Sequence, residues 1–228
     1  MFKNLFGSKK NKPTAQSLLV DIHSHLLPGL DDGVESFDES VDIIREFKKM
    51  GFKKLITTPH IMGDFFKNNP EDIYAKVKEL NSILVSENID MVVEAAAEYY
   101  LDEWLIDKVD KGEQLMTFGD NFVLMETSYI NEASHLHHVV FQLKTKGYKP
   151  VLAHPERYTY LYNDFSKYQE LLDLGVYFQI NTISLLGYYS KKAKQIAEKL
   201  VENQMVHFLG SDCHGDRHLQ ALYKTMKE

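Results

Sequence analysis

In two short segments of the chain, two side chains of metal-binding type are separated by a single residue. One residue separates His23 from His25, and one separates Asp212 from His214. In an extended strand alternate residues point to the same side, so both members of each pair would face one way. Converging imidazole and carboxylate groups are typical ligands of divalent metal ions. A lone His-x-His segment is explained equally well by hydrogen-bonded imidazoles, so the interpretation depends on further donors.

Further donors follow most of the other short apolar runs that are rich in β-forming residues. With the first two pairs, they are His23, His25, His60, Glu98, Glu126, His154, Asp212 and His214. A turn after His25 adds Asp31 and Asp32. One of these acids could complete a site with His60 and His214. Nitrogen and oxygen donors without a thiolate favour Mn²⁺, Fe²⁺ or Zn²⁺.

The size of the donor set indicates more than one metal ion. Five imidazoles and four carboxylates exceed the roughly four to six ligands of one ion. Two or three ions are therefore expected, with Glu98 as a bridging carboxylate. Three divalent ions would exceed the charge of four carboxylates by two, which suits a phosphomonoester dianion. Because a metal lowers the pKa of bound water from about 15.7 towards 7, the expected reaction is attack of a metal-bound hydroxide on phosphorus.

Two arginines follow histidine donors at the same spacing. Arg157 lies three residues after His154, and Arg217 lies three residues after His214. A guanidinium can bind two phosphate oxygens at once, so both arginines are predicted to be catalytic. A surface salt bridge is the alternative for each. His60 and His214 are the other candidate catalytic residues.

Three remaining features of the chain have less specific explanations. Gln179 and Asn181 end the one run without a donor, and their amides could hydrogen-bond a substrate. Three histidines within residues 135–138 fit a solvated helix face better than a metal site. Cys213 has no phosphate-cradling loop with a following arginine, so nucleophilic thiol chemistry is set aside.

Short apolar runs alternate with segments of helical period, which predicts an α/β fold in a single domain. The runs expected to form buried strands are Leu18–Ile22, Lys54–Thr58, Met91–Ala96, Phe122–Met125, Pro150–Ala153, Val176–Ile180 and Val206–Gly210. Helical patterns between them cover Val41–Met50, Ile73–Val85, Ala133–Leu143 and Ala193–Val201. Seven such units fit either an open doubly wound sheet or a barrel, and in both the strand ends meet on one face.

Composition restricts the classes of partner. The formal charge of −7 over 228 residues disfavours nucleic acid, whose binding requires clustered Lys and Arg. A single cysteine suits a reducing compartment, so the cytoplasm is expected. No apolar run approaches the roughly 18 residues that span a bilayer. Residues 1–16 are expected to be a solvated, flexible tail or a weak contact to the inner membrane surface, and residues 17–228 the folded domain.

The motifs resemble those of the polymerase and histidinol phosphatase family. The resemblance lies in Asp21-Ile22-His23-Ser24-His25-Leu26-Leu27-Pro28, Asp31-Asp32-Gly33, Thr58-Pro59-His60, Ala97-Glu98, Ala153-His154-Pro155-Glu156-Arg157 and Ser211-Asp212-Cys213-His214, in the family's order. It spans about residues 20–218. Within that family the chain is similar to the bacterial manganese-dependent protein-tyrosine phosphatases of capsular and exopolysaccharide operons.

The resemblance implies roles for the donors. One ion would be held by His23, His25, Glu98 and Asp212. A second would be held by Glu98, Glu126 and His154. A third would be held by His60, His214 and an acid of the Asp31–Asp32 pair. Asp21 would support the ligands from behind.

The resemblance also implies a fold, a substrate and a partner. The fold would be a distorted TIM-like (β/α)7 barrel, and the metal most consistent with the family is Mn²⁺. The substrate would be phosphotyrosine on a membrane-bound bacterial tyrosine autokinase that controls polysaccharide export. The extension before the first strand and the end of the chain at Glu228 depart from the family pattern. Hydrolysis of a small phosphomonoester such as histidinol phosphate, or binding of a phosphoprotein without turnover, are the alternatives.

Overall fold

A computed structural model describes residues 19–227. The predicted tail at 1–16 lies outside the described residues. Every run predicted to be a strand forms one, with ends that agree within two residues. The strands of the described part are β1 (Val20–Asp21), β2 (Lys54–Thr57), β3 (His60–Ile61), β4 (Val92–Ala95), β5 (Glu98–Tyr100), β6 (Phe122–Glu126), β7 (Lys149–Ala153), β8 (Tyr177–Asn181) and β9 (Phe208–Gly210).

The strands form a ring of parallel segments. One sheet has the order β1-β2-β4, and the other has the order β3-β5-β6-β7-β8-β9. β2 resumes after two residues as β3, and β4 resumes after two residues as β5, so the two sheets share two chain segments. The first and last segments meet where the N–H of His25 donates to the carbonyl of Cys213 at 2.9 Å and that of Asp212 to the carbonyl of His23 at 2.8 Å. Of the two arrangements predicted from the sequence, the distorted TIM-like barrel is therefore confirmed rather than the open doubly wound sheet.

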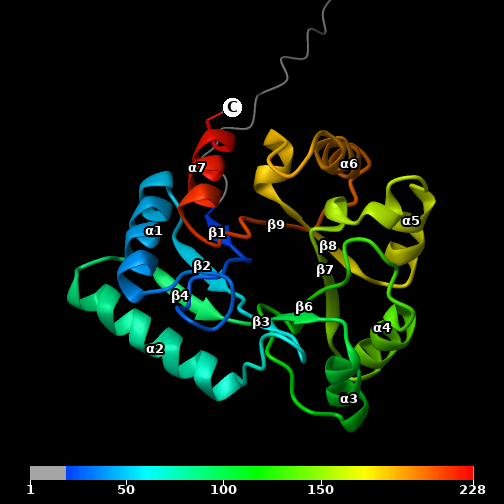
Figure 1. Cartoon of the computed structure of the whole chain (residues 1–228), viewed down its shortest axis with the longest axis horizontal. Coiled ribbons are helices and arrows are strands. Elements are labelled where there is room, and N and C mark those ends of the chain that lie inside the picture. The colour runs from blue at the N-terminus through cyan, green and yellow to red at the C-terminus, as the bar shows by residue number, and fades with distance from the viewer. Residues whose placement is uncertain (1–18, 228) are drawn as a thin grey trace, which may run out of the picture.

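The helices surround the strands, as Figure 1 shows. In the described residues they are α1 (Phe37–Met50), α2 (Pro70–Ser86), α3 (Glu103–Lys111), α4 (Leu136–Thr145), α5 (Ser166–Asp173), α6 (Lys191–Glu202) and α7 (Asp216–Thr225). Helix α1 illustrates why these segments form helices. Ser36 caps α1 by accepting from the N–H of Glu39, and Gly51 ends it with a φ of 100°. Val41, Ile44 and Phe47 give α1 one buried face.

A small apolar cluster lies on the inner face of the barrel. Alternate residues share one face of a strand, so Leu124 lies on the same face of β6 as Glu126. Leu124 packs with Ile56, Ala96 and Val151, which come from three neighbouring segments. This layer supports the carboxylates at the strand ends. A larger cluster fills the space between the strands and the helices. Within residues 19–227, no helix has the length and apolarity needed to cross a membrane.

Candidate metal centre

The strand ends bring the predicted donors to one end of the barrel. His60 on β3 is paired with Glu98 on β5, and Glu126 ends β6, next to β5. His154 directly follows β7, and the other donors follow β1 and β9. Parallel strands present their carboxyl ends on one face, so residues distant in sequence meet there. The donors at the strand ends are buried except His214, which is partly buried. In the turn after His25, Asp31 is partly buried and Asp32 is exposed.

The first donor cluster joins four residues whose donor atoms lie within 4.8 Å of one another, namely His23, His25, Glu98 and Asp212. The Nε2 atoms of His23 and His25 are 3.2 Å apart. Oε2 of Glu98 is 3.0 Å from Nε2 of His23. Oδ1 of Asp212 is 3.4 and 3.5 Å from the same two nitrogens. The residues are those that the family resemblance assigned to one ion.

Hydrogen bonds behind the two imidazoles determine which nitrogen faces the cluster. Nδ1 of His23 is 2.8 Å from Oε1 of Gln179, and Nδ1 of His25 is 2.7 Å from Oδ2 of Asp31. Both oxygens are acceptors, so each Nδ1 carries a proton, and a ring that has lost its second proton turns the Nε2 lone pair inward. Two lone pairs facing each other repel unless a cation lies between them. The donor set therefore fits a divalent metal ion.

Electrostatics in the first cluster favour positive charge. Burial disfavours the imidazolium of His23, but Glu98 and Asp212 outweigh burial and raise its pKa to about 10. Burial also disfavours the carboxylate of Glu98, yet His23 and a hydrogen bond from His154 hold the pKa of Glu98 well below its usual value. Carboxylates that stabilise protons in this way can bind a metal cation in their place.

A second cluster shares Glu98 with the first. It contains His60, Glu98 and Glu126, with Nε2 of His60 3.3 Å from an oxygen of each carboxylate. Nε2 of His154 is 3.1 Å from Oε1 of Glu98 and 3.7 Å from Oε2 of Glu126. The two oxygens of Glu98 thus face different sets of imidazoles. This is the geometry that a bridging carboxylate needs.

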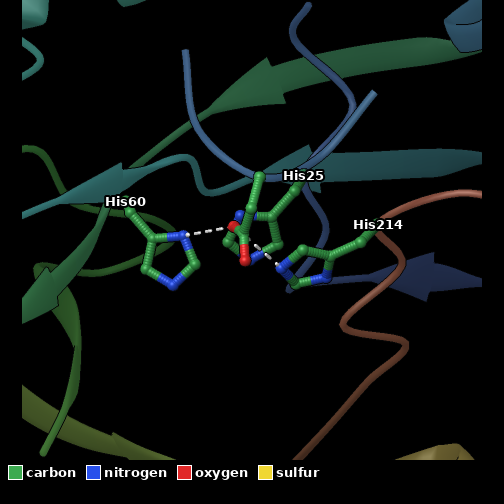
Figure 2. Close-up of side chains that lie close together, drawn as sticks. His25, His60 and His214 are labelled. Carbon is green, nitrogen blue, oxygen red and sulfur yellow. Dashed lines mark ion pairs between the residues drawn. The ribbon is translucent and has the colours of Figure 1, made fainter. Parts of the chain in front are cut away.

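A third cluster contains His25, Asp32, His60 and His214. Figure 2 shows the three imidazoles converging. Oδ1 of Asp32 is 3.4 Å from Nδ1 of His60 and 3.4 Å from Nε2 of His214. Asp31 lies outside all three clusters, because its Oδ2 accepts from the ring of His25 and from the backbone N–H of His60. The structure therefore separates the two neighbouring acids, with Asp32 among the donors and Asp31 behind them.

A cavity of about 520 Å³ opens onto the clusters and includes Arg157 in its wall. The Nη1 atom of Arg157 donates to Oδ2 of Asp212 at 2.9 Å. Its guanidinium carbon lies 4.6 Å from the ring centroid of Tyr129 and 4.0 Å from that of Tyr189. Arg217 is exposed in the first turn of α7 and lines a neighbouring hollow instead. Of the two predicted arginines, the structure brings only Arg157 to the donors.

Comparison with known proteins identifies the family. The model of the capsular polysaccharide synthesis family CpsB/CapC matches residues 19–225. The chain belongs to this family. YwqE of Bacillus subtilis strain 168, a tyrosine-protein phosphatase, is 31% identical over 215 residues, which cover 92% of this chain and 85% of that protein. CpsB of Streptococcus pneumoniae, also a tyrosine-protein phosphatase, is 30% identical over 202 residues, covering 86% of this chain and 83% of CpsB.

A solved structure agrees with this CpsB/CapC assignment. It comes from work on YwqE of Bacillus subtilis and CpsB of Streptococcus pneumoniae, described there as unique metal-dependent tyrosine phosphatases. The TM-score is 0.82 at 30% identity, over 91% of this chain and 86% of the other. The family resemblance predicted from the motifs is confirmed.

In this CpsB/CapC member, strained backbone turns two donors towards the site. His154 has a φ of 34° and Asp212 a φ of 52°. Left-handed conformations cost a non-glycine residue about 1–3 kcal/mol and are typical of functional sites. Nearby, a Cβ added to Gly210 would lie 2.6 Å from Cβ of His23. Only glycine allows β9 to pass so close to the first cluster.

The lone cysteine and the three histidines at the start of α4 lie outside the three donor clusters. Cys213 is fully buried, and burial raises the pKa of its thiol above its usual range, so little nucleophilic thiolate forms. The histidines within residues 135–138 are all exposed. His138 pairs with Asp110 at 3.0 Å.

The amides of Gln179 and Asn181 differ from their predicted role. Both are fully buried and neither lines the cavity. Gln179 orients His23, and the Nδ2 of Asn181 donates to Oδ2 of Asp212 at 2.6 Å. They contact the candidate ligands rather than the space where a substrate would bind.

Proposed function

We propose that this chain is a metal-dependent phosphatase that removes phosphate from tyrosine residues of proteins. The observation that carries the proposal is the convergence of three donor clusters on one cavity that also holds the guanidinium of Arg157. Membership of the CpsB/CapC family supports the same reading. Two relatives of about 30% identity are tyrosine-protein phosphatases.

We assign the clusters to two or three divalent ions. The donors suit Mn²⁺, Fe²⁺ and Zn²⁺, and we propose Mn²⁺ on the family resemblance. His23, His25, Glu98 and Asp212 would hold the first ion, Glu98, Glu126 and His154 the second, and His60, His214 and Asp32 the third. Asp31 would orient His25 rather than bind metal. When bound, such ions activate water and neutralise the charge that develops on the phosphoryl oxygens.

Within this proposal Arg157 binds the phosphoryl oxygens of the substrate. Its guanidinium is always charged and planar, and a side chain 20% exposed leaves part of it free towards the cavity. Arg217 could join only from the neighbouring hollow, through a movement of the first turn of α7. His60 and His214 face the cavity from the third cluster, and with two ions bound instead of three they could exchange protons with the leaving group.

The surroundings of the cavity favour a peptide substrate over a small metabolite. Tyr129 and Phe66 line the cavity. Their chain neighbours Ile130 and Phe65 are 71% and 73% exposed. Exposed apolar side chains beside a site are typical of contacts with a second polypeptide. A metabolite the size of histidinol phosphate would leave them uncovered.

The proposed partner is a membrane-bound bacterial tyrosine kinase that controls capsule or exopolysaccharide synthesis. The support is the family description, which concerns capsular polysaccharide synthesis. Acting on such a kinase would place this chain in the cytoplasm, at the inner face of the membrane.

The decisive experiment measures phosphate release from a phosphotyrosine peptide by purified protein, with Mn²⁺ added or with chelator. Mn²⁺ should support turnover and the chelator should abolish it. Glu98→Gln should lower kcat/KM by more than about 100-fold, because loss of outer-shell partners alone costs about 10- to 100-fold. Glu94→Gln is the matched control, since Glu94 is exposed and pairs with Lys54 outside the donor clusters, and it should behave as wild type.

Three results would contradict the proposal. They are turnover in metal-free protein, equal kcat/KM values for the two variants, and a kcat/KM for histidinol phosphate far above that for the peptide. Binding of the peptide without phosphate release in Mn²⁺-loaded protein would indicate a non-catalytic phosphoprotein-binding role instead.

A further inference from the structure

Tyr189 touches both functional parts of the site, although the sequence motifs do not include it. It lies between the short 3-10 helix Thr182–Leu186 and α6. Its ring centroid is 4.0 Å from the guanidinium carbon of Arg157. Its hydroxyl accepts from Nδ2 of Asn181 at 3.0 Å and donates to Oδ2 of Asp212 at 3.2 Å. One side chain thus connects the candidate phosphate-binding group with a candidate metal ligand.

The two oxygens of Asp212 have opposite surroundings. Oδ2 receives three donors, from Arg157 at 2.9 Å, Asn181 at 2.6 Å and Tyr189 at 3.2 Å. Oδ1 instead faces imidazole nitrogens of His23, His25 and His214 at 3.4 to 3.5 Å. A carboxylate oxygen has about two lone-pair sites, so three donors occupy all of them. Oδ2 is therefore saturated, and Oδ1 is the oxygen left for a metal ion.

We propose that Tyr189 is a positioning residue that fixes the rotation of the Asp212 carboxylate and the plane of the Arg157 guanidinium at the same time. The inference rests on the proposed function, since it assigns roles to residues of that site. The hydroxyl acts on Asp212 and therefore on metal affinity. The ring acts on Arg157, through the attraction between a cation and an aromatic face, and therefore on substrate affinity.

The position of the hydroxyl makes the first role specific. Arg157 can leave Oδ2 of Asp212 when it binds a phosphate, because a guanidinium offers several donors to whichever anion is near. The hydroxyl of Tyr189 and the amide of Asn181 keep their hydrogen bonds to Oδ2 of Asp212. Both groups are neutral, so a phosphate attracts them less strongly than it attracts the guanidinium. They keep the carboxylate from rotating while Arg157 exchanges partners.

Two substitutions at this position separate the roles. Tyr189→Phe removes the hydroxyl and keeps the ring, whereas Tyr189→Leu removes both. For each variant, Mn²⁺ affinity is measured by electron paramagnetic resonance of the free ion, without substrate. The kinetic constants kcat and KM are then measured on a phosphotyrosine peptide at saturating Mn²⁺. Circular dichroism and Tm confirm that the variants fold.

Both variants should bind Mn²⁺ about 3- to 10-fold more weakly, the range expected for one hydrogen bond. At saturating Mn²⁺, Tyr189→Phe should keep a wild-type KM, whereas Tyr189→Leu should raise KM by about 3- to 10-fold through loss of the cation–aromatic contact. The matched controls are Tyr74→Phe and Tyr74→Leu, because Tyr74 is exposed on α2 and does not line the cavity. Both controls should bind Mn²⁺ with wild-type affinity.

Unchanged Mn²⁺ affinity in Tyr189→Phe, or an equal KM for the Phe and Leu variants, would overturn the inference. The metal measurement uses no substrate, so it stands even if wild-type protein proves inactive on phosphotyrosine. In that case the proposed function fails while the role of the hydroxyl is still decided.

Discussion

The pKa values of single histidines determine how protons compete with metal ions for the site. Burial disfavours charge on the imidazoles of His23 and His214, but facing carboxylates outweigh it and raise their pKa values to about 10 and about 9. For His60 the same opposition of burial and carboxylates raises the pKa to about 12. All three rings are therefore protonated at neutral pH in the metal-free protein. A metal ion binds only the neutral ring, so each ligating imidazole must first lose its proton.

Binding of Mn²⁺ should therefore release protons, and apparent affinity should fall as the pH is lowered from 8 to 6. The raised pKa values set this sign, because lower pH adds protons that compete with the metal. Titration calorimetry in buffers of different ionisation enthalpy measures the number released, and we expect about two to three per protein. His214→Gln should release about one proton fewer. His138→Gln, at an exposed histidine paired with Asp110, should match wild type. A buffer-independent heat would contradict the prediction.

The sequence predicted the donors better than the residues that support them. His60, Glu98 and Glu126 stand out because a donor at a strand end is visible in the chain itself. The separate roles of Asp31 and Asp32 depend on the path of one turn, which residue types do not specify. Tyr189 was missed because two of its contacts, Arg157 and Asp212, come from distant segments of the chain. Its only signal was an aromatic residue after the sixth predicted strand.

At the scale of elements, the strands were predictable and several helices were not. Buried parallel strands appear as short apolar runs, and all seven were found. β3 and β5 were not predicted, because each is a brief continuation of the strand before it across a break. α5 begins at Ser166 without a side-chain cap, so the start signal was absent. α3 and α7 are short, with only two or three buried residues each, which gives a weak periodic pattern.

The loops that follow β3 and β6 should contribute to peptide binding. They carry the exposed residues Phe65 and Ile130 beside the cavity. Phe65→Ser should raise KM for a phosphotyrosine peptide by about 3- to 10-fold, since partial burial of a phenyl ring contributes about 1 kcal/mol. KM for free phosphotyrosine should not change. Steady-state kinetics on both substrates checks the difference.

Phe141→Ser provides the matched control for this loop prediction. Phe141 is 65% exposed, but it lies on the outer helix α4 rather than beside the cavity. It should leave both KM values unchanged. If Phe65→Ser raised the two KM values equally, the loop would be acting on the catalytic site itself rather than on the flanking peptide.

At the scale of the whole molecule, closing the ring and building the site are one structural event. The metal donors of β1 and β9 meet only because the first and last segments of the chain are joined. Besides the backbone hydrogen bonds, Asp21 makes this junction. Its carboxylate accepts from the backbone N–H of Ser211 at 2.6 Å and from the hydroxyl of Ser211 at 2.8 Å. Its predicted supporting role is thus exerted on the segment that carries Asp212 rather than on His23.

Asp21→Ala should lower the free energy of unfolding by about 1–3 kcal/mol, because it leaves the buried N–H of Ser211 without an acceptor. The hydroxyl of Ser211 keeps only its longer hydrogen bond to the carbonyl of His23, at 3.2 Å. Denaturant titration of metal-free protein measures this loss without the added stability that bound metal confers. Asp120→Ala is the same substitution at an exposed ion pair with Lys149, where about 0.5 kcal/mol or less is expected. Equal losses in the two variants would mean that Asp21 does not hold the ring closed. A larger loss at Asp21, accompanied by weaker Mn²⁺ binding, would show that the junction stabilises the barrel and orients its metal ligands together.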